Sequence, residues 1–296
     1  MDFRDKYILI TAAHNEEKFI ELTIKSVISQ ELKPLQWIII NDNSTDKTGE
    51  IIERYIVDIK FIKLLNISRK DGRDFSSKVY AINEGLKNLK NIEFDFIGIL
   101  DADVSFEPNF YSTLIAEFHK NNNLGIVGGD YFDIVNGQKK YIKPSPYSVR
   151  GATQFFRREC FEQIGGLIPI KYGGEDALAC YAARMYGWKI KNVNSAQVIH
   201  HKPTGSANSS SFKKRFNDGR MEFYLGYHPI FQLLKCFKRV FYKPAIIGSI
   251  LQLLGFWFSF LFDSKSTVAN ELRSYIKRSQ LKHLMGLSLF RKNIFN

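Results

Sequence analysis

The sequence contains little cysteine. Its three cysteines, Cys160, Cys180 and Cys236, are odd in number, lie far apart and form no CxxC pair. This pattern argues against a disulfide framework and against a structural zinc site, and it favours a reducing compartment. Charged residues flank the strand-length apolar run within residues 1–17, so we expect no secretory signal there.

Positive charge is concentrated towards the C-terminus. The chain carries a formal charge of +12, and residues 213–296 hold 15 of its 42 Lys and Arg but only four of its 30 acidic residues. Residues 1–212 are therefore nearly neutral. The basic segment surrounds the longest uncharged apolar run, so we expect an anionic membrane surface, and not nucleic acid, as its partner.

Short apolar runs alternate with amphipathic segments over the first 130 residues. The runs are rich in Ile, Val and Phe, as buried strands are, and lie at 7–12, 37–40, 59–65, 96–100 and 124–127. The segments between them have helical spacing and lie at 17–29, 45–55, 78–89 and 109–120. This alternation predicts an α/β fold with a Rossmann-like, mostly parallel central sheet, in which ligands bind beyond the carboxyl ends of the strands.

The pattern becomes less regular after residue 128. We expect a polar loop at 136–148, helices at 158–164 and 175–186, and a strand at 197–200. A stretch rich in Ser, Gly and Asn at 204–211 then marks a boundary. The sequence therefore predicts a catalytic domain at 1–212 and a basic helical region at 213–296.

Polar residues follow three of the predicted strands. AHNEE follows the first at 13–17, NDNSTD the second at 41–46, and DAD the fourth at 101–103. Taken singly, the first two segments are typical helix caps and the third is an ordinary acidic turn. Alternate carboxylates at a strand end point to the same side, however, so Asp101 and Asp103 could both reach one hard cation.

Together, these segments resemble glycosyltransferase family 2, whose members are inverting enzymes with the GT-A fold. The matching segments follow the family's order across about residues 6–205: TAAHNEE, IINDNSTDKT, SSKVYAINEGL, ILDADV, FFRRECFEQIGGL, GGEDALACYAARMYGWKI and VIHH. The resemblance implies a nucleoside-diphosphate sugar as donor and a divalent metal, Mg²⁺ or Mn²⁺, as cofactor.

The resemblance also implies roles for residues at the strand ends. Asp103 would bind the cation, and Asp101 would lie near the sugar or the ribose. Asp42 would accept a hydrogen bond from the nucleotide base, and Ala12 and Asn15 would line the base and ribose pocket.

Further roles follow for later parts of the chain. Lys78 would face the nucleotide, unless it is a solvated lysine in the first turn of a helix. Inversion needs a general base for the acceptor hydroxyl. The resemblance points to the pair Glu175 and Asp176, of which we expect Asp176 to be the base; alternatively, both only stabilise a helix start. His200 or His201 could complete the metal site, although a single histidine is more often structural.

The apolar run at 245–262 contains no charged residue over eighteen positions. As a helix it would be about 27 Å long, against a hydrocarbon core of about 30 Å. Its polar residues and basic flanks favour a helix in the membrane interface or a re-entrant hairpin over a spanning helix, and a buried core helix is the alternative. A basic helical pattern continues at 271–285. We expect attachment at the cytosolic face of a membrane.

The resemblance to glycosyltransferase family 2 implies transfer of a single sugar to a hydroxyl of a glycan. For an enzyme attached to a membrane, we expect this acceptor to be a lipid-linked saccharide. RFNDGR at 215–220 is not the QxxRW-type motif of the family's processive polymerases, which argues against polymer synthesis. Two alternatives remain. A sugar-phosphate nucleotidyltransferase should have a Gly-rich basic loop where this chain has TAAHNEE, and a non-catalytic membrane adaptor could keep the same fold.

Overall fold

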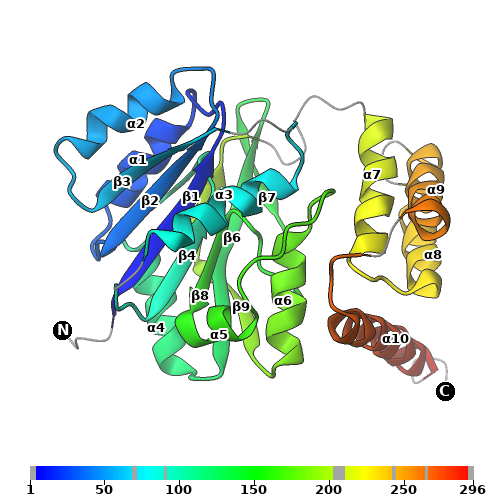
Figure 1. Cartoon of the computed structure of the whole chain (residues 1–296). Helices are drawn as coiled ribbons and strands as arrows, with labels where there is room; N and C mark the ends of the chain where they lie inside the picture. Colours follow the sequence, from blue (N-terminus) through cyan, green and yellow to red (C-terminus); the bar gives the residue numbers. More distant parts are fainter. Residues whose placement is uncertain are drawn as a thin grey trace. The chain divides into compact units, whose positions relative to one another are not determined.

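The computed structural model describes residues 5–68, 72–89, 92–202, 211–241, 245–263 and 266–292 (Figure 1). The chain divides into two compact units. The first consists of Met1–Pro169 and Glu175–Thr204, and the second of Ile170–Gly174 and Gly205–Asn296. The predicted boundary stretch, 204–211, lies outside the described residues except for Ser211, at which a helix begins.

The first unit is built on a nine-stranded sheet. Its strands follow the order β3-β2-β1-β4-β8-β6-β9-β5, and β7 pairs with β6. Their bounds are β1 Tyr7–Ala13, β2 Gln36–Asp42, β3 Ile62–Ile67, β4 Phe96–Leu100, β5 Val104–Phe106, β6 Leu124–Val135, β7 Gln138–Ile142, β8 Thr153–Arg157 and β9 Lys189–His200.

The sheet is mixed: four strand pairs, among them β6 with β9, are parallel and four are antiparallel. Strands β3, β2, β1 and β4 run parallel to one another, as the alternation predicted. Strand β8 is antiparallel to both β4 and β6, and β5 and β7 are antiparallel to β9 and β6. The predicted parallel sheet is therefore confirmed for β1 to β4, whereas the second half is mixed, and β7 occupies part of the predicted polar loop. The residues of β7 are almost all exposed, so this strand has no apolar pattern.

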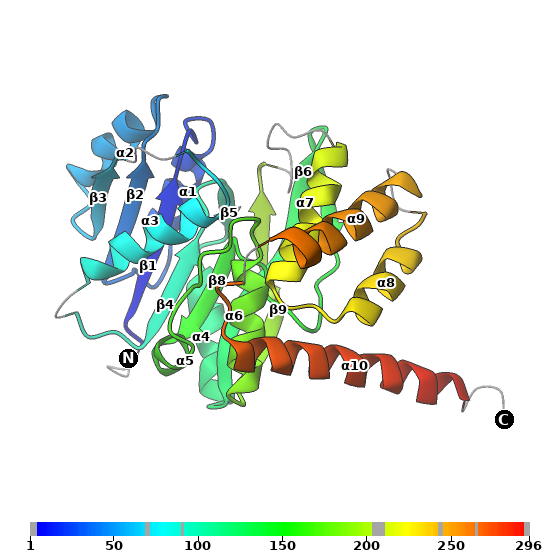
Figure 2. The same cartoon turned by 45° about the vertical axis from the view of Figure 1, so that its right-hand side comes forward.

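Helices cover both faces of the sheet (Figures 1 and 2). Tyr7 and Leu9 of β1 share one core with α1, α2 and α4, whereas Ile10 and Ile40 meet α3 on the other face. A Cβ on Gly85 of α3 would lie 2.7 Å from Cδ1 of Ile40, so a larger residue there would force the Ile40 side chain to shift. Because both faces are covered, the central strands are apolar at nearly every position. The helices are α1 Ile20–Ile28, α2 Thr48–Ile56, α3 Ser76–Lys87, α4 Phe110–Lys120, α5 Arg158–Gln163 and α6 Glu175–Met185.

The second unit is helical in its described part, with α7 Ser211–Tyr224, α8 Pro229–Lys238, α9 Ile247–Phe262 and α10 Asn270–Lys292. Helices α7 and α9 lie side by side in both views (Figures 1 and 2). They touch at two glycines: a Cβ on Gly219 would lie 1.9 Å from the carbonyl oxygen of Gln252, and one on Gly255 would lie 2.0 Å from that of Phe216. No larger residue fits at either position.

Helix α9 turns its polar residues inward and, apart from the buried Phe256, most of its large apolar residues outward. Gln252 and Ser259 are 1% and 0% exposed, whereas Leu254 and Leu261 are 53% and 66% exposed. An amphipathic helix of a water-exposed surface has the opposite arrangement. No helix within the described ranges is both long and apolar enough to cross a bilayer.

Candidate active site

The loops after β1 and β2 are joined by hydrogen bonds. Asn15 has a φ of 54°, a left-handed conformation that Asn adopts more readily than most residues. Its N–H donates to Oγ of Ser44 (3.1 Å), and its Oδ1 accepts from the N–H of Thr45 (2.8 Å). Nδ1 of His14 lies 2.7 Å from the carbonyl oxygen of Asp42. The structure thus places Asn15, on the loop after β1, near Asp42 at the end of β2.

Asp42 ends β2 and is only 1% exposed. Nη1 of Arg73 lies 2.5 Å from its Oδ2, so the buried carboxylate is paired with a guanidinium. Ala12 of β1 is half-buried and pairs with Ile40 of β2, two residues before Asp42. The three residues predicted to line the nucleotide pocket therefore lie on adjacent strands and their loops.

Lys78, in the first turn of α3, links carboxylates from two other elements. Its Nζ lies 2.5 Å from Oδ1 of Asp101, which follows β4, and 3.8 Å from Oε1 of Glu175 at the start of α6. Burial lowers the pKa of Lys78, but the charges of Asp101 and Glu175 outweigh this effect and raise that pKa overall. Lys78 is therefore a charged, paired lysine inside the site and not a solvated one.

Glu175 and Asp176 have different surroundings. Burial raises the pKa of Glu175, although the charge of Lys78 opposes the shift. Oδ2 of Asp176 accepts a hydrogen bond from the N–H of Gly151 (3.1 Å), and its Oδ1 accepts one from the N–H of Ala177 (2.7 Å). Each carboxylate oxygen has a second lone pair, so Asp176 can still take up a proton. The two carboxylates that the sequence paired thus differ in their contacts: Glu175 faces a cation and Asp176 faces backbone amides.

Asp103, His200 and Asp133 form a row of buried side chains. Nε2 of His200 lies 3.5 Å from Oδ2 of Asp103, and its Nδ1 lies 3.1 Å from Oδ1 of Asp133. The row is built by strand pairing, because Asp133 of β6 lies opposite His200 of β9. A carboxylate only accepts hydrogen bonds, so in the neutral imidazole Asp133 holds the proton on Nδ1 and leaves the lone pair on Nε2.

Electrostatics at this row favour a charged imidazole when no cation is bound. Burial lowers the pKa of His200, but its hydrogen bond to Asp103 and the charge of that carboxylate outweigh burial and raise the pKa overall. Nη1 of Arg150 lies 3.9 Å from Oδ1 of Asp133 and adds a second positive group.

His201 has different neighbours. Its Nε2 lies 2.8 Å from Oγ of Ser105, and its ring stacks on Phe19 with centroids 6.0 Å apart. Burial lowers the pKa of His201. Of the two candidate histidines, His200 is thus the one whose ring contacts the Asp103 carboxylate.

The residues present can supply part of a metal site. Oδ1 of Asp103 is buried and has no hydrogen-bond partner among the described residues. Within those residues, no three His, Cys, Asp or Glu side chains are grouped as a metal site would need. Mg²⁺ commonly takes only one or two carboxylates from a protein and completes its shell with substrate phosphates and water. Asp103 with His200 fits such a partial site.

Three charged residues of this region were not predicted from the sequence. They are Arg73, Lys202 and Asp133. Arg73 lies in a polar segment before α3, and Asp133 lies in the part of β6 that extends beyond the expected strand. Lys202 follows β9, and its Nζ lies 2.7 Å from Oε1 of Glu16. Burial raises the pKa of Glu16 despite that lysine. Of these three residues, only Asp133 has a signal in the sequence: Asp130 and Asp133 interrupt the otherwise apolar run that continues β6.

Comparison with known proteins identifies the family. Residues 8–178 match the model of Glycosyl transferase family 2. The poly-β-1,6-N-acetyl-D-glucosamine synthase of Staphylococcus epidermidis is 34% identical over 123 residues, which make up 41% of this chain and 27% of the synthase. The matched region thus spans about a quarter of that relative's length.

Two solved structures share the fold. The mannosyltransferase PcManGT from Pyrobaculum calidifontis, in complex with GDP-Man and Mn²⁺, has a TM-score of 0.56 and 15% identity, covering 97% of this chain and 81% of that one. Staphylococcus aureus TarS 1–349, in complex with UDP-GlcNAc, has a TM-score of 0.54 and 16% identity, covering 92% and 78%. The chain therefore has a GT-A-like fold. The family model spans more than half of the chain, from β1 to the start of α6, and the chain accordingly belongs to glycosyl transferase family 2.

Proposed function

We propose that this chain transfers one sugar from a nucleoside-diphosphate sugar to a hydroxyl group, with inversion at the anomeric carbon. The observation that carries the proposal is the gathering of Asp42, Asp101, Asp103, Lys78 and Glu175 around the carboxyl ends of the parallel strands, in a chain of this family. Ligands of parallel α/β sheets bind at this edge.

The donor would bind with its base near Asp42, and Ala12 and Asn15 would line the base and ribose pocket. The Asp42 carboxylate is buried and held by Arg73, so it is a fixed acceptor for a base N–H. Asp101 would lie near the sugar or the ribose, and Lys78 would place its positive charge towards the nucleotide. PcManGT binds GDP-Man and TarS binds UDP-GlcNAc, which supports a nucleoside-diphosphate donor without selecting a base.

Asp103 and His200 would hold a divalent cation, Mg²⁺ or Mn²⁺. Bound there, the cation would offset the negative charge that develops on the diphosphate leaving group. The contribution of Asp133 would be to orient the imidazole of His200, as outer carboxylates do for metal-binding histidines. The Mn²⁺ in the PcManGT complex supports this part of the proposal.

The acceptor hydroxyl would lose its proton to a carboxylate at the start of α6. Its oxygen bonds to the anomeric carbon while the bond from that carbon to the diphosphate oxygen breaks, and the proton passes to the general base. We assign this role to Asp176. Glu175 is the other carboxylate of the pair and would act with Lys78 to keep the charge of the site balanced.

The second unit would dock the enzyme on a membrane at its cytosolic face, where the acceptor would be a lipid-linked saccharide. The support is the inverted arrangement of α9, which exposes Leu254, Trp257 and Leu261 and buries Gln252 and Ser259. A helix of this kind gains free energy when its apolar face enters the membrane interface, and nearby lysines and arginines add attraction to anionic lipids.

A donor panel tests the proposed reaction. Purified full-length protein would be heated with UDP-, GDP- and dTDP-sugars, each with Mn²⁺ and with EDTA, and the melting temperature measured. We expect one nucleotide class to raise the melting temperature in Mn²⁺ and to be hydrolysed slowly in the absence of acceptor. A chain that binds no nucleotide sugar in Mn²⁺ would be an adaptor and not a transferase.

A further inference from the structure

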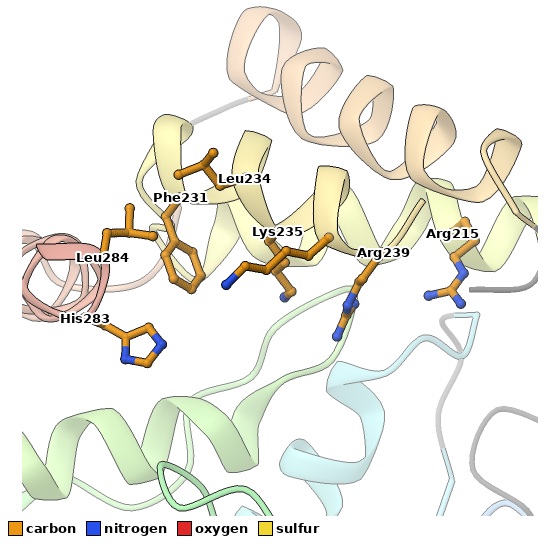
Figure 3. A pocket seen from close by; sticks show the side chains of 8 residues that line it. Arg215, Phe231, Leu234, Lys235, Arg239, His283 and Leu284 are labelled. Carbon is orange, nitrogen blue, oxygen red and sulfur yellow. The ribbon is translucent and has the colours of Figure 1, made fainter. Parts of the chain in front are cut away.

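Helices α7, α8 and α10 of the second unit line an open pocket of about 530 Å³, which shares no residue with the candidate active site. Figure 3 shows side chains from all three helices around it. It is lined by Arg215 of α7, by Phe231, Leu234, Lys235, Lys238 and Arg239 of α8 and its C-cap, and by His283 and Leu284 of α10.

The lining of the pocket is strongly basic. Phe231, Lys235 and Arg239 are four residues apart, so they project from one face of α8 (Figure 3). Four of the eight lining residues are Lys or Arg, and none is acidic. Positive charge that is gathered in one pocket attracts an anion.

Acidic neighbours balance only part of this charge. Nη1 of Arg215 lies 3.6 Å from Oδ2 of Asp218, and Lys235 is paired with the buried carboxylate of Glu222. Lys238 and Arg239 make no salt bridge with any residue in the described ranges. The α8 side of the pocket therefore offers two cationic groups to a ligand.

An apolar stripe runs along α8 and into the turn after it, next to the pocket. It consists of Ile230, Leu233, Phe237 and Phe241, which are 53–87% exposed and spaced three and four residues apart. Leu234 joins the two surfaces, because it lines the pocket and neighbours Ile230 and Phe237 on the helix. Contiguous exposed apolar residues of this kind mark interaction sites.

We propose that this pocket binds the phosphate headgroup of an anionic membrane phospholipid while the apolar stripe enters the acyl region beside it. The chemistry required is an anion attached to an apolar body, because a free phosphate would use the cations and leave the stripe in water. The inference rests on the proposed membrane docking of the second unit and adds a headgroup site to it.

Vesicle binding of the full-length chain tests the site. The partition coefficient would be measured by co-sedimentation with phosphatidylcholine vesicles and with vesicles that also contain phosphatidylglycerol. Lys238→Gln/Arg239→Gln would be compared with Lys277→Gln/Arg278→Gln, which removes the same charge from α10 outside the pocket. Far-UV circular dichroism would check that each variant is folded. Arg239→Lys keeps the positive charge and tests whether that charge alone is enough for binding to phosphatidylglycerol.

We expect phosphatidylglycerol to increase binding and the pocket variant to lose roughly 30-fold of that binding, against roughly 5-fold or less for the α10 variant. Binding to phosphatidylcholine should be almost the same for wild type and both variants, since it depends on apolar contacts. Equal losses in the two double variants would overturn the pocket and leave only diffuse attraction. Thermal stabilisation by inorganic phosphate without any preference for phosphatidylglycerol would overturn the lipid assignment. Absence of binding to every vesicle would instead refute the membrane docking itself.

Discussion

Lys78→Met tests whether the ion pairs of Lys78 with Asp101 and Glu175 stabilise the folded protein at the candidate site. The variant keeps the length of the side chain and removes the charge that lies 2.5 Å from Asp101 and 3.8 Å from Glu175. At an effective dielectric constant of about 20, the closer pair alone has a gross Coulomb energy of about 7 kcal/mol. Burial of the ammonium group cancels most of this energy, and we expect a net loss of about 1–3 kcal/mol in the free energy of unfolding.

The loss should depend on pH in a definite direction. Burial already raises the pKa of Glu175, and removal of Lys78 raises it further. A carboxyl group whose folded-state pKa lies above its unfolded value destabilises the fold as the pH rises through that interval. The difference between wild type and variant should therefore be smaller near about pH 4 than near about pH 8.

Urea denaturation of wild type and variant at several pH values measures this difference. Lys87→Met is a matched control, because Lys87 lies on the same helix and its pair with Glu84 is exposed. Exposed pairs of this kind contribute about 0.5 kcal/mol or less. If Lys78→Met costs no more than Lys87→Met, or costs most at acidic pH, the electrostatic account of the site is refuted.

Three further variants test individual parts of the account. Asp133→Asn should weaken Mn²⁺ binding by about 10–100-fold in a competition assay, because the neighbouring imidazole loses its orienting carboxylate; an unchanged affinity would remove Asp133 from the site. Asp176→Asn should lower transfer by about 10²–10⁴-fold with little change in donor affinity, and Glu175→Gln should be milder; the reverse order would make Glu175 the base. Leu254→Asn/Leu261→Asn should reduce binding to zwitterionic vesicles, whereas a core role predicts unfolding instead.

The part of the fold that could be predicted from the sequence is the part with parallel, fully buried strands. Ile8–Ile10 of β1 and Ile38–Ile40 of β2 are apolar on both faces, so the runs stand out and the polar residues after them mark the site edge. Asp42, Asp101 and Asp103 come at or just after the ends of such runs. Their place at the ligand-binding edge of the sheet could therefore be predicted from the sequence.

The remaining features depend on long-range pairing that no local pattern shows. Strand β7 is exposed and polar, and β8 inserts antiparallel between β4 and β6. The contact of His200 with Asp133 needs the β6–β9 register across 67 residues, and the pairing of Arg73 with Asp42 needs the chain after β3 to return to β2. The inward orientation of Gln252 in α9 likewise depends on a long-range contact, because its Nε2 donates a hydrogen bond to Oε1 of Glu222 in α7.

The measurement that tests the central proposal most directly is donor turnover by Asp103→Ala as a function of Mn²⁺ concentration. The control is Asp95→Ala, which removes a carboxylate that directly precedes β4, whereas Asp103 lies beyond the other end of that strand. We expect wild type and Asp95→Ala to require Mn²⁺ or Mg²⁺ and to lose activity in EDTA. Asp103→Ala should remain folded and lose roughly 10²–10³-fold in turnover at every metal concentration. Undiminished turnover of the wild type in EDTA, or of Asp103→Ala in Mn²⁺, would contradict the proposed metal-assisted transfer.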